Sequence, residues 1–273
     1  ANMAQDGFTA SVHFNADKDR LCLDGNKLMA VSGQYGDSGT IYRSEMDRFV
    51  RVTQSGDINA HNSWFKVERK NGSVAYYGFN SNSRHKLSGK TEVLSWLISS
   101  ENDSLHSGDR SSAKNVIHYE YGVYGEGEKL IDAIHYTGEG SSYGNRSVTF
   151  HYADRPDDSS SYLGGGLRRQ TKRLDNIQTK YNQQVIRKYS LNYDLSQTSN
   201  RSILVGVVEC TDGGVTCLPE TTIDWYAERV THSATNSQSA IKNMQSNDAF
   251  NDFNFADING DGLPEYIRTY KSI

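Results

Sequence analysis

The chain has 273 residues, a length that suits one large domain or two smaller ones. Hydrophobic residues make up 36% and charged residues 23%, and the net charge of −4 gives no electrostatic case for nucleic-acid binding. The longest apolar run, Ile203 to Val208, is far shorter than the roughly 20 residues that span a membrane. We therefore expect no nucleic-acid partner and no membrane span.

The composition favours β-structure. The chain contains 24 glycines and 17 tyrosines but only three prolines. Tyrosine, threonine and valine suit pleated, half-buried surfaces, and glycine with Asn and Asp supplies tight turns. No long stretch repeats apolar residues at helical spacing. We expect an all-β fold, an antiparallel meander or sandwich-like domain made of many hairpins.

The segment Trp64–Phe79 predicts a hairpin. Two alternating runs flank Asn71–Gly72, a pair typical of the type I′ turn because both central residues of that turn need positive φ. A two-residue loop at this point would pair Val67 with Tyr76. That register places four apolar side chains on one buried face: Phe65, Val67, Val74 and Tyr76.

Three later segments resemble one another: VIHYEY (Val116–Tyr121), AIHYTG (Ala133–Gly138) and TFHYAD (Thr149–Asp154). Each has an apolar residue before His-Tyr, and the spacing of about 16 residues with Gly-rich connections predicts an antiparallel meander. Histidine is a common metal ligand. Because His and Tyr alternate between the two faces of a strand, however, we favour a polar row along adjacent strands, made by His118, His135 and His151.

The residues between Arg155 and Arg173 are mostly Ser, Asp, Gly and basic residues, which predicts a long loop. Its Gly164–Gly166 run is not a phosphate-binding loop, because no Gly-Lys-Ser/Thr follows it. Alternating or apolar runs then predict three more strands: Val185–Asp194, Ser202–Cys210 and Thr221–Tyr226.

Three cysteines are present, and two of them, Cys210 and Cys217, bracket TDGGVT. A turn at Asp212–Gly214 would bring their Cα atoms within disulfide range. A disulfide closing so short a loop would stabilise the fold by roughly 2–3 kcal/mol. Two reduced thiols in a hairpin are the alternative. Cys22 is then the odd cysteine, either free and buried or lacking its partner.

Beyond Trp225 the sequence becomes polar and poor in strand-forming residues. This change predicts a linker over residues 229–247. We therefore divide the chain into a β domain at residues 1–228, the linker, and the start of a second unit at residues 248–273.

The second unit contains FADINGDGLPEYI, Phe255–Ile267. Calcium takes six to eight hard oxygen ligands, and oxygen-bearing side chains stand at positions 1, 3, 5 and 9 counted from the first Asp. Position 12, where an EF-hand has Glu, is Arg268, and the flanks alternate like strands. An ordinary Asp/Gly turn is the alternative. The expected cofactor is calcium and the expected ligands, the last but one through its main-chain carbonyl, are Asp257, Asn259, Asp261, Leu263 and Glu265.

Long stretches of the sequence carry a family resemblance. RLCLDG…RFVRV (Arg20–Val52), SWFKVERKNGSVAYYG (Ser63–Gly78) and the stretch Leu167–Tyr226 resemble the SpvB-like N-terminal region of insecticidal toxin-complex (Tc) B components and Rhs-related toxins. The resemblance covers about Ala4 to Tyr226. The acidic loop is similar to the calcium loops of FG-GAP/VCBS repeats, which follow that region in the family and build a β-propeller.

The resemblance implies a non-catalytic scaffold of a large toxin-like virulence protein, secreted or on the bacterial cell surface. In toxin complexes these parts form a shell and propeller that encapsulate and pass on a toxic C-terminal polypeptide. The implied partners are the remainder of its own polypeptide and other toxin-complex subunits.

Two other classes of function compete with the scaffold. In some relatives this region precedes an ADP-ribosyltransferase, an enzyme that uses an Arg, an S-T-S strand and an ExE turn. Here Glu126 and Glu128 have the ExE form, but no S-T-S strand accompanies them. No other catalytic or cofactor-binding set stands out. A cell-surface adhesin or carbohydrate-binding module is the alternative, since the tyrosines and an exposed Trp64 could form a sugar platform.

Overall fold

The computed structural model describes residues 12–15, 18–46, 49–103, 110–211, 213–225, 253–256 and 265–268, the last two ranges by their backbone. By its contacts the chain divides into two compact units, Ala1–Asp194 with Ser202–Ile223, and Leu195–Arg201 with Asp224–Ile273. No α-helix occurs among the described residues, so the expected all-β, antiparallel fold is confirmed.

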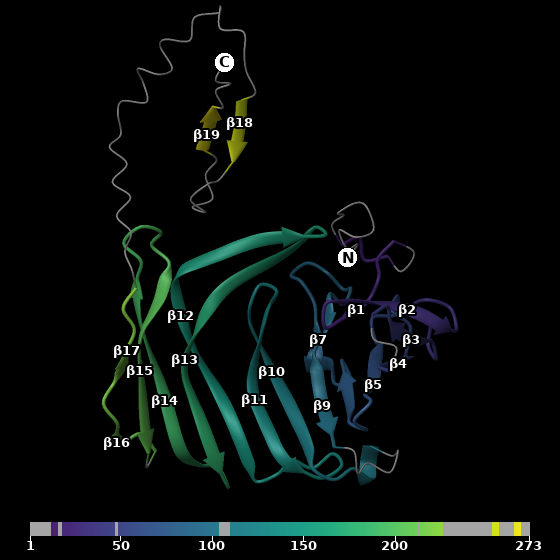
Figure 1. Cartoon of the computed structure of the whole chain (residues 1–273), viewed down its shortest axis with the longest axis horizontal. Coiled ribbons are helices and arrows are strands. Elements are labelled where there is room, and N and C mark those ends of the chain that lie inside the picture. The colour runs from purple at the N-terminus through teal and green to yellow at the C-terminus, as the bar shows by residue number, and fades with distance from the viewer. Residues whose placement is uncertain are drawn as a thin grey trace, which may run out of the picture. The chain divides into compact units, whose positions relative to one another are not determined.

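The first unit is one large antiparallel sheet (Figure 1). Its strands are β1 (Cys22–Leu23), β2 (Asn26–Ser32), β3 (Ile41–Ser44), β4 (Arg51–Ser55), β5 (Trp64–Glu68), β6 (Val74–Tyr77), β9 (Ile98–Asn102), β10 (Val116–Gly125), β11 (Glu128–Gly138), β12 (Arg146–Leu163), β13 (Gly166–Tyr181), β14 (Gln184–Leu195), β15 (Ser202–Thr211), β16 (Thr216–Cys217) and β17 (Thr221–Thr222).

The strands follow one another in the sheet almost as they follow in the chain, with β17 beside β15. One insertion interrupts this order between β6 and β9. It holds the 3-10 turn η2 (Ser81–Ser83) and a small hairpin of β7 (Arg84–His85) and β8 (Ser95–Trp96). A second 3-10 turn, η3 (Arg110–Ser112), precedes β10. The predicted meander of three His-Tyr segments is confirmed as β10, β11 and β12.

The β5–β6 hairpin is present, but its predicted register was wrong by one residue. Arg69 N–H donates to Ser73 O, and within that three-residue loop the Gly72 N–H donates to Arg69 O, while Gly72 alone takes a positive φ of 84°. This geometry is a type I turn closed by a left-handed glycine rather than a type I′ turn. Val67 therefore pairs with Ala75.

A one-residue slip moves every side chain of a strand to the other face. Phe65 and Val67 share the core face with Ala75, whereas Val74 and Tyr76 lie on the opposite face. All five side chains are buried, because β6 is covered on both faces. The core face continues across the first strands as one apolar cluster: Leu28, Tyr42, Val52, Phe65, Val67 and Ala75.

Tyrosine hydroxyls complete the hydrogen bonding where the sheet is irregular. The β6–β9 register shifts next to Ile98, and Tyr121 Oη donates to Ile98 O at 2.9 Å. The β10–β11 register shifts next to Ile131, and Tyr152 Oη donates to Ile131 O at 2.7 Å. A carbonyl freed by a bulge needs such a partner when it is shielded from water. Burial raises the pKa of Tyr152 to about 12, so its hydroxyl remains a donor at neutral pH.

The segment predicted as a loop between Arg155 and Arg173 is instead part of the long β12–β13 hairpin. Figure 1 shows the outer ends of β12 and β13 turning away from β14 and running toward β7. We call this outer hairpin, Ser159–Gln170, the arm. The strand predicted at Thr221–Tyr226 is shorter than expected, since only Thr221–Thr222 pairs with β15.

The second unit contains an antiparallel pair, β18 (Phe253–Ala256) and β19 (Glu265–Arg268), which pair from Phe253–Arg268 to Ala256–Glu265. The flanks of the acidic loop are therefore strands, as predicted. The predicted linker, residues 229–247, lies outside the described residues. Within the described part of the chain, no helix has the length and apolar character needed to cross a membrane.

Candidate functional site

The arm begins at a wide bulge in β12. Asp154 pairs with Lys172 and Ser159 with Gln170, so four residues of β12, 155–158, stand opposite the single residue Thr171. A bulge bends its strand and leaves backbone groups without their ladder partners. Two carboxylates stabilise this bulge: Asp157 within it, and Glu128, which accepts from the β13 backbone opposite it.

Asp157 holds the β12 side of the bulge. Its carboxylate accepts hydrogen bonds from Arg155 Nη2 at 2.8 Å, Ser202 N at 2.9 Å and Ser202 Oγ at 2.6 Å. The Asp157 side chain is only 9% exposed. The Arg155 guanidinium, followed by the Ser202 donors, holds the pKa of Asp157 well below its usual range. The two hydrogen bonds from Ser202 connect the bulge to β15.

Glu128 holds the β13 side. Its carboxylate accepts from Thr171 N at 2.8 Å, Thr171 Oγ1 at 2.7 Å and Lys172 N at 3.4 Å. Glu128 is buried, and buried carboxylates are stabilised by such donors. Its predecessor in the ExE form, Glu126, lies 3.6 Å from Arg169 Nη1 as an exposed ion pair. Glu128 therefore holds the base of the arm, and Glu126 pairs with Arg169 within it.

The tip of the arm docks on the inserted hairpin region. Ser88 and Leu167 exchange two backbone hydrogen bonds, at 3.0 and 3.2 Å. Gly164 and Gly165, at φ 53° and 75°, make the turn. Gly166 lies so close to Leu87 that an added Cβ would be 2.6 Å from the Leu87 Cβ. The three glycines thus serve the turn and the close approach of the tip.

The predicted histidine row holds two members. His118 and His135 are direct cross-strand partners, and the Tyr143 ring lies 4.9 Å and 4.5 Å from their rings. Burial, with Arg110 and His135 nearby, lowers the pKa of His118. His151 does not join them, because Ser147 is the residue of β12 that pairs with His135. Among the described residues no three His, Cys, Asp or Glu side chains gather closely enough to share a metal ion.

Trp64 is not the exposed platform that the carbohydrate-binding alternative needs. Its side chain is half-buried, and its ring lies 5.1 Å from Phe79 and 6.1 Å from Tyr76. Arg110 covers the same cluster, with its guanidinium 4.1 Å from the Phe79 ring centre. These rings therefore pack against one another, edge to face or tilted, and against a cation of the same chain.

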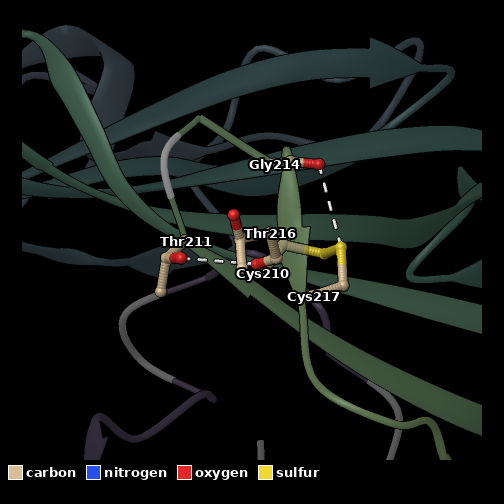
Figure 2. Close-up of a disulfide and its surroundings, with 5 residues drawn as sticks. All are labelled: Cys210, Thr211, Gly214, Thr216 and Cys217. Atoms are coloured by element: carbon tan, nitrogen blue, oxygen red, sulfur yellow. Dashed lines mark hydrogen bonds between the residues drawn. A yellow bond between two sulfur atoms is a disulfide. The ribbon is translucent and has the colours of Figure 1, made fainter.

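Cys210 and Cys217 form a disulfide between paired residues of β15 and β16, as Figure 2 shows. The connecting turn is closed by Gly214 N–H, which donates to Thr211 O at 2.9 Å, and Thr211 Oγ1 donates to Thr216 O at 3.3 Å. Cys22 is a free and exposed thiol, so the expectation of a free and buried cysteine is wrong, whereas the other expectation, a cysteine that lacks its partner, stays a prediction.

The predicted calcium ligands fall largely outside the described residues. Asp257, Asn259, Asp261 and Leu263 are not described, and Glu265 is described by its backbone as the first residue of β19. Ala256 and Glu265 are cross-strand partners of β18 and β19, so the two ends of the predicted calcium loop meet in a strand pair.

Sequence reasoning missed Asp157 and the role of Glu128. One signal was available, because Pro156 stands inside the segment that forms β12. Proline cannot donate to the ladder and is confined to edges, strand starts and bulges, so it marks the bulge. Nothing in the sequence pairs Glu128 with Thr171, which is 43 positions away.

No family model matches the chain, and no curated protein matches its sequence. Solved structures do match its fold. A crystal structure of TcdB2-TccC3 matches with a TM-score of 0.62 at 17% identity over 78% of this chain, and one of TcdB2-TccC3-Cdc42 with 0.65 at 17% identity over 95%. This chain spans only 14% and 15% of those chains. The N-terminal domain of the effector SpvB from Salmonella typhimurium strain LT2 matches with 0.56 at 13% identity, over 79% of this chain and 84% of that domain.

The chain has the fold of these toxin-complex and SpvB structures. The fold expected from the resemblance is therefore confirmed for the large sheet. At these identities the likeness concerns the fold alone.

Proposed function

We propose that this chain is a structural, non-catalytic module of a large secreted or surface toxin-like protein of the Tc/Rhs kind. In this role the sheet is one part of a shell that encapsulates or presents a C-terminal effector, and β18–β19 begin a propeller of FG-GAP/VCBS repeats. The partners are the rest of the same polypeptide and other toxin-complex subunits.

The observation that carries the proposal is the use of the buried charges around the arm. Glu128, Asp157 and Arg155 are spent on hydrogen bonds that hold the β12–β13 bend, which is the behaviour of a scaffold. The fold likeness to TcdB2-TccC3 and to the SpvB domain supports the same reading. The Cys210–Cys217 disulfide supports export, because disulfides persist in oxidising compartments.

Limited proteolysis of the full-length polypeptide tests the shell role. If the effector is enclosed, its cleavage sites stay uncut while exposed linkers are cleaved, and the effector expressed alone is digested rapidly. Mass spectrometry of the fragments over time measures both rates. Equal digestion of the effector in the two settings would contradict encapsulation. The glycan-binding alternative has lost its main observation, since Trp64 packs within an aromatic cluster.

We also propose that the loop between β18 and β19 binds one calcium ion through the predicted oxygen ligands. The strand pair that closes the loop supports this, because the two ends of the loop are brought together. Isothermal titration of calcium into the full-length polypeptide should lose one equivalent in an Asp261→Asn variant, since a monodentate carboxylate is removed. Asp252→Asn, outside the ligand pattern, is the matched control. Identical stoichiometry for wild type and Asp261→Asn would refute the site.

A further inference from the structure

A cavity of about 580 Å³ lies between the inserted region and the β10–β11 turn. One wall comes from residues 81–88 and the other from residues 123–129. His61 also lines the cavity, and its Nδ1 is shielded from solvent without a hydrogen-bond partner among the described residues. Cavities of this volume take ligands of small-molecule size.

Hydrogen bonds join the two walls of this cavity. Lys129 Nζ donates to Asn82 O at 2.7 Å and to Arg84 O at 2.9 Å. His85 Nε2 donates to Gly127 O at 2.8 Å, since a carbonyl oxygen can only accept. The fold itself therefore sets the spacing of the walls, and a ligand would enter a preformed site.

The described lining of the cavity includes three cations: Arg84, Lys86 and Lys129. None of the three forms an ion pair within the part of the chain that the structure describes. Burial, followed by the nearby charge of Lys86, lowers the pKa of Lys129. The positive charges of the cavity are therefore close enough to repel one another.

Two carboxylates also line the cavity, but both have other partners. Glu128 accepts the backbone N–H of Thr171 at 2.8 Å, and Glu126 lies 3.6 Å from Arg169 Nη1. Neither carboxylate forms an ion pair with the lysines or the arginine of the described lining. The chain therefore leaves the positive charge of this cavity without a close counter-charge.

The cations also keep hydrogen-bond donors for a ligand. Arg84 Nε donates to Gly78 O at 2.8 Å and Arg84 Nη2 to Phe79 O at 3.3 Å, which uses two of the five guanidinium N–H groups. Lys129 uses two of its three N–H groups on the opposite wall. Lys86 is exposed and makes no hydrogen bond to any other residue that the structure describes.

We propose that this cavity binds a small multivalent anion, a molecule that carries phosphate or carboxylate groups. Its oxygens accept hydrogen bonds from Arg84, Lys86 and Lys129, and its charge relieves their mutual repulsion. Hydrogen bonds between ionised partners are the strong ones, so such a ligand uses the unpaired donors best. The inference goes beyond the shell role and does not rest on it, because it concerns one cavity inside the first unit.

Isothermal titration of the 273-residue chain, in a low-salt buffer freed of divalent cations, tests the proposal with pyrophosphate and with citrate. One equivalent of either anion should bind. Binding of pyrophosphate alone assigns a phosphate-bearing ligand, and binding of citrate alone a carboxylate-bearing one. Failure of both anions to bind would overturn the proposal.

Two variants at exposed positions should shift the affinity in opposite directions. Lys86→Gln should weaken binding about tenfold, because a charged donor is lost. Glu126→Gln should tighten it, because a negative charge at the cavity is removed. Lys114→Gln is the matched control, since Lys114 is exposed and does not line the cavity. Equal weakening by Lys86→Gln and Lys114→Gln would show general charge screening rather than a site.

Nuclear magnetic resonance locates the bound anion independently of these variants. In a ¹⁵N-labelled chain, titration with the anion that binds should shift the amide signals of Ser88, Gly125 and Gly127, which line the cavity. The amide of Gly206, in β15, should stay unchanged. Shifts confined to amides outside the cavity would overturn the proposal.

Discussion

At the scale of single residues, the bend of the β12–β13 hairpin depends on two carboxylates that act on opposite strands. Glu128 receives the backbone N–H of Thr171, and Asp157 receives that of Ser202. Hydrogen bonds to a charged acceptor are roughly twice as strong as neutral ones. Removing either acceptor would leave partly buried N–H groups without that partner, so the loss of stability would exceed the loss of the hydrogen bond itself.

We expect Asp157→Asn to lower the free energy of unfolding by about 2 kcal/mol at pH 7, because hydrogen bonds to a charged group are lost. The folded-state pKa of Asp157 is depressed, so its stabilising contribution is complete above the unfolded value of about 3.9. That contribution is lost as the pH falls below this value toward the folded-state pKa. The gap between wild type and variant should therefore narrow in acid.

Urea unfolding at several pH values measures that gap. Asp158→Asn is the matched control, because Asp158 pairs with Arg169 at the surface and its side chain is 48% exposed. Exposed pairs contribute about 0–1 kcal/mol. A gap between wild type and Asp157→Asn that stays constant from pH 7 to pH 2 would count against the assigned role of this carboxylate.

At the scale of elements, the arm shows where sequence patterns stop being informative. Strands in the core half of the sheet alternate because one or both faces are buried, and the hairpin at residues 64–79 was found on that basis. The arm is mostly exposed on both faces from Ser159 to Tyr162, so its residues carry no period-2 signal. Its pairing is fixed by contacts at its base and tip, which lie far apart in sequence.

The one-residue error in the β5–β6 register has a related cause. Val74 and Tyr76 are apolar, and so is Ala75 between them, because β6 is buried on both sides. Periodicity cannot choose a face for such a strand. The turn then decides the register, and Asn71–Gly72 is compatible with loops of two or three residues.

We expect Gly166→Val to undock the tip of the arm, because its side chain would enter the space of Leu87, and overpacking of this kind costs about 1–3 kcal/mol. Hydrogen exchange at the Ser88 and Leu167 amides should speed up, since these two residues hold the tip by backbone bonds. Ser161→Val on the exposed arm is the control and should leave both amides protected. Unchanged protection in Gly166→Val would show that the tip tolerates the added bulk.

At the scale of the whole molecule, the meander, the disulfide pair and the strand flanks of the acidic loop were all within reach of the sequence. Each rests on local spacing. The long-range hydrogen bonds could not be predicted from the sequence, since Asp157–Ser202 and Glu128–Thr171 join residues 45 and 43 positions apart. Without the fold, no pattern links such residues.

The disulfide at the β15–β16 end adds a test of global stability. Reduction should lower the free energy of unfolding by roughly 2–3 kcal/mol, because the short loop between Cys210 and Cys217 no longer restricts the unfolded chain. Denaturant unfolding with and without dithiothreitol measures the change. A Cys210→Ala, Cys217→Ala variant should match the reduced wild type and ignore the reductant, whereas Cys22→Ser should behave like wild type. If dithiothreitol also lowered the free energy of unfolding of the double variant, the effect of the reductant would not come from the Cys210–Cys217 disulfide.

The docked tip of the arm also bears on the order of folding. We expect Ser88 and Leu167 to meet after the β7–β8 region and the β12–β13 hairpin have each formed, because their contact joins two separate hairpins. Contacts between distant parts of the sequence form slowly, and contacts absent from the transition state govern the unfolding rate rather than the folding rate. We therefore expect the contact at the tip of the arm to form late in folding. Its main contribution would be to slow unfolding, which lengthens the lifetime of the folded state.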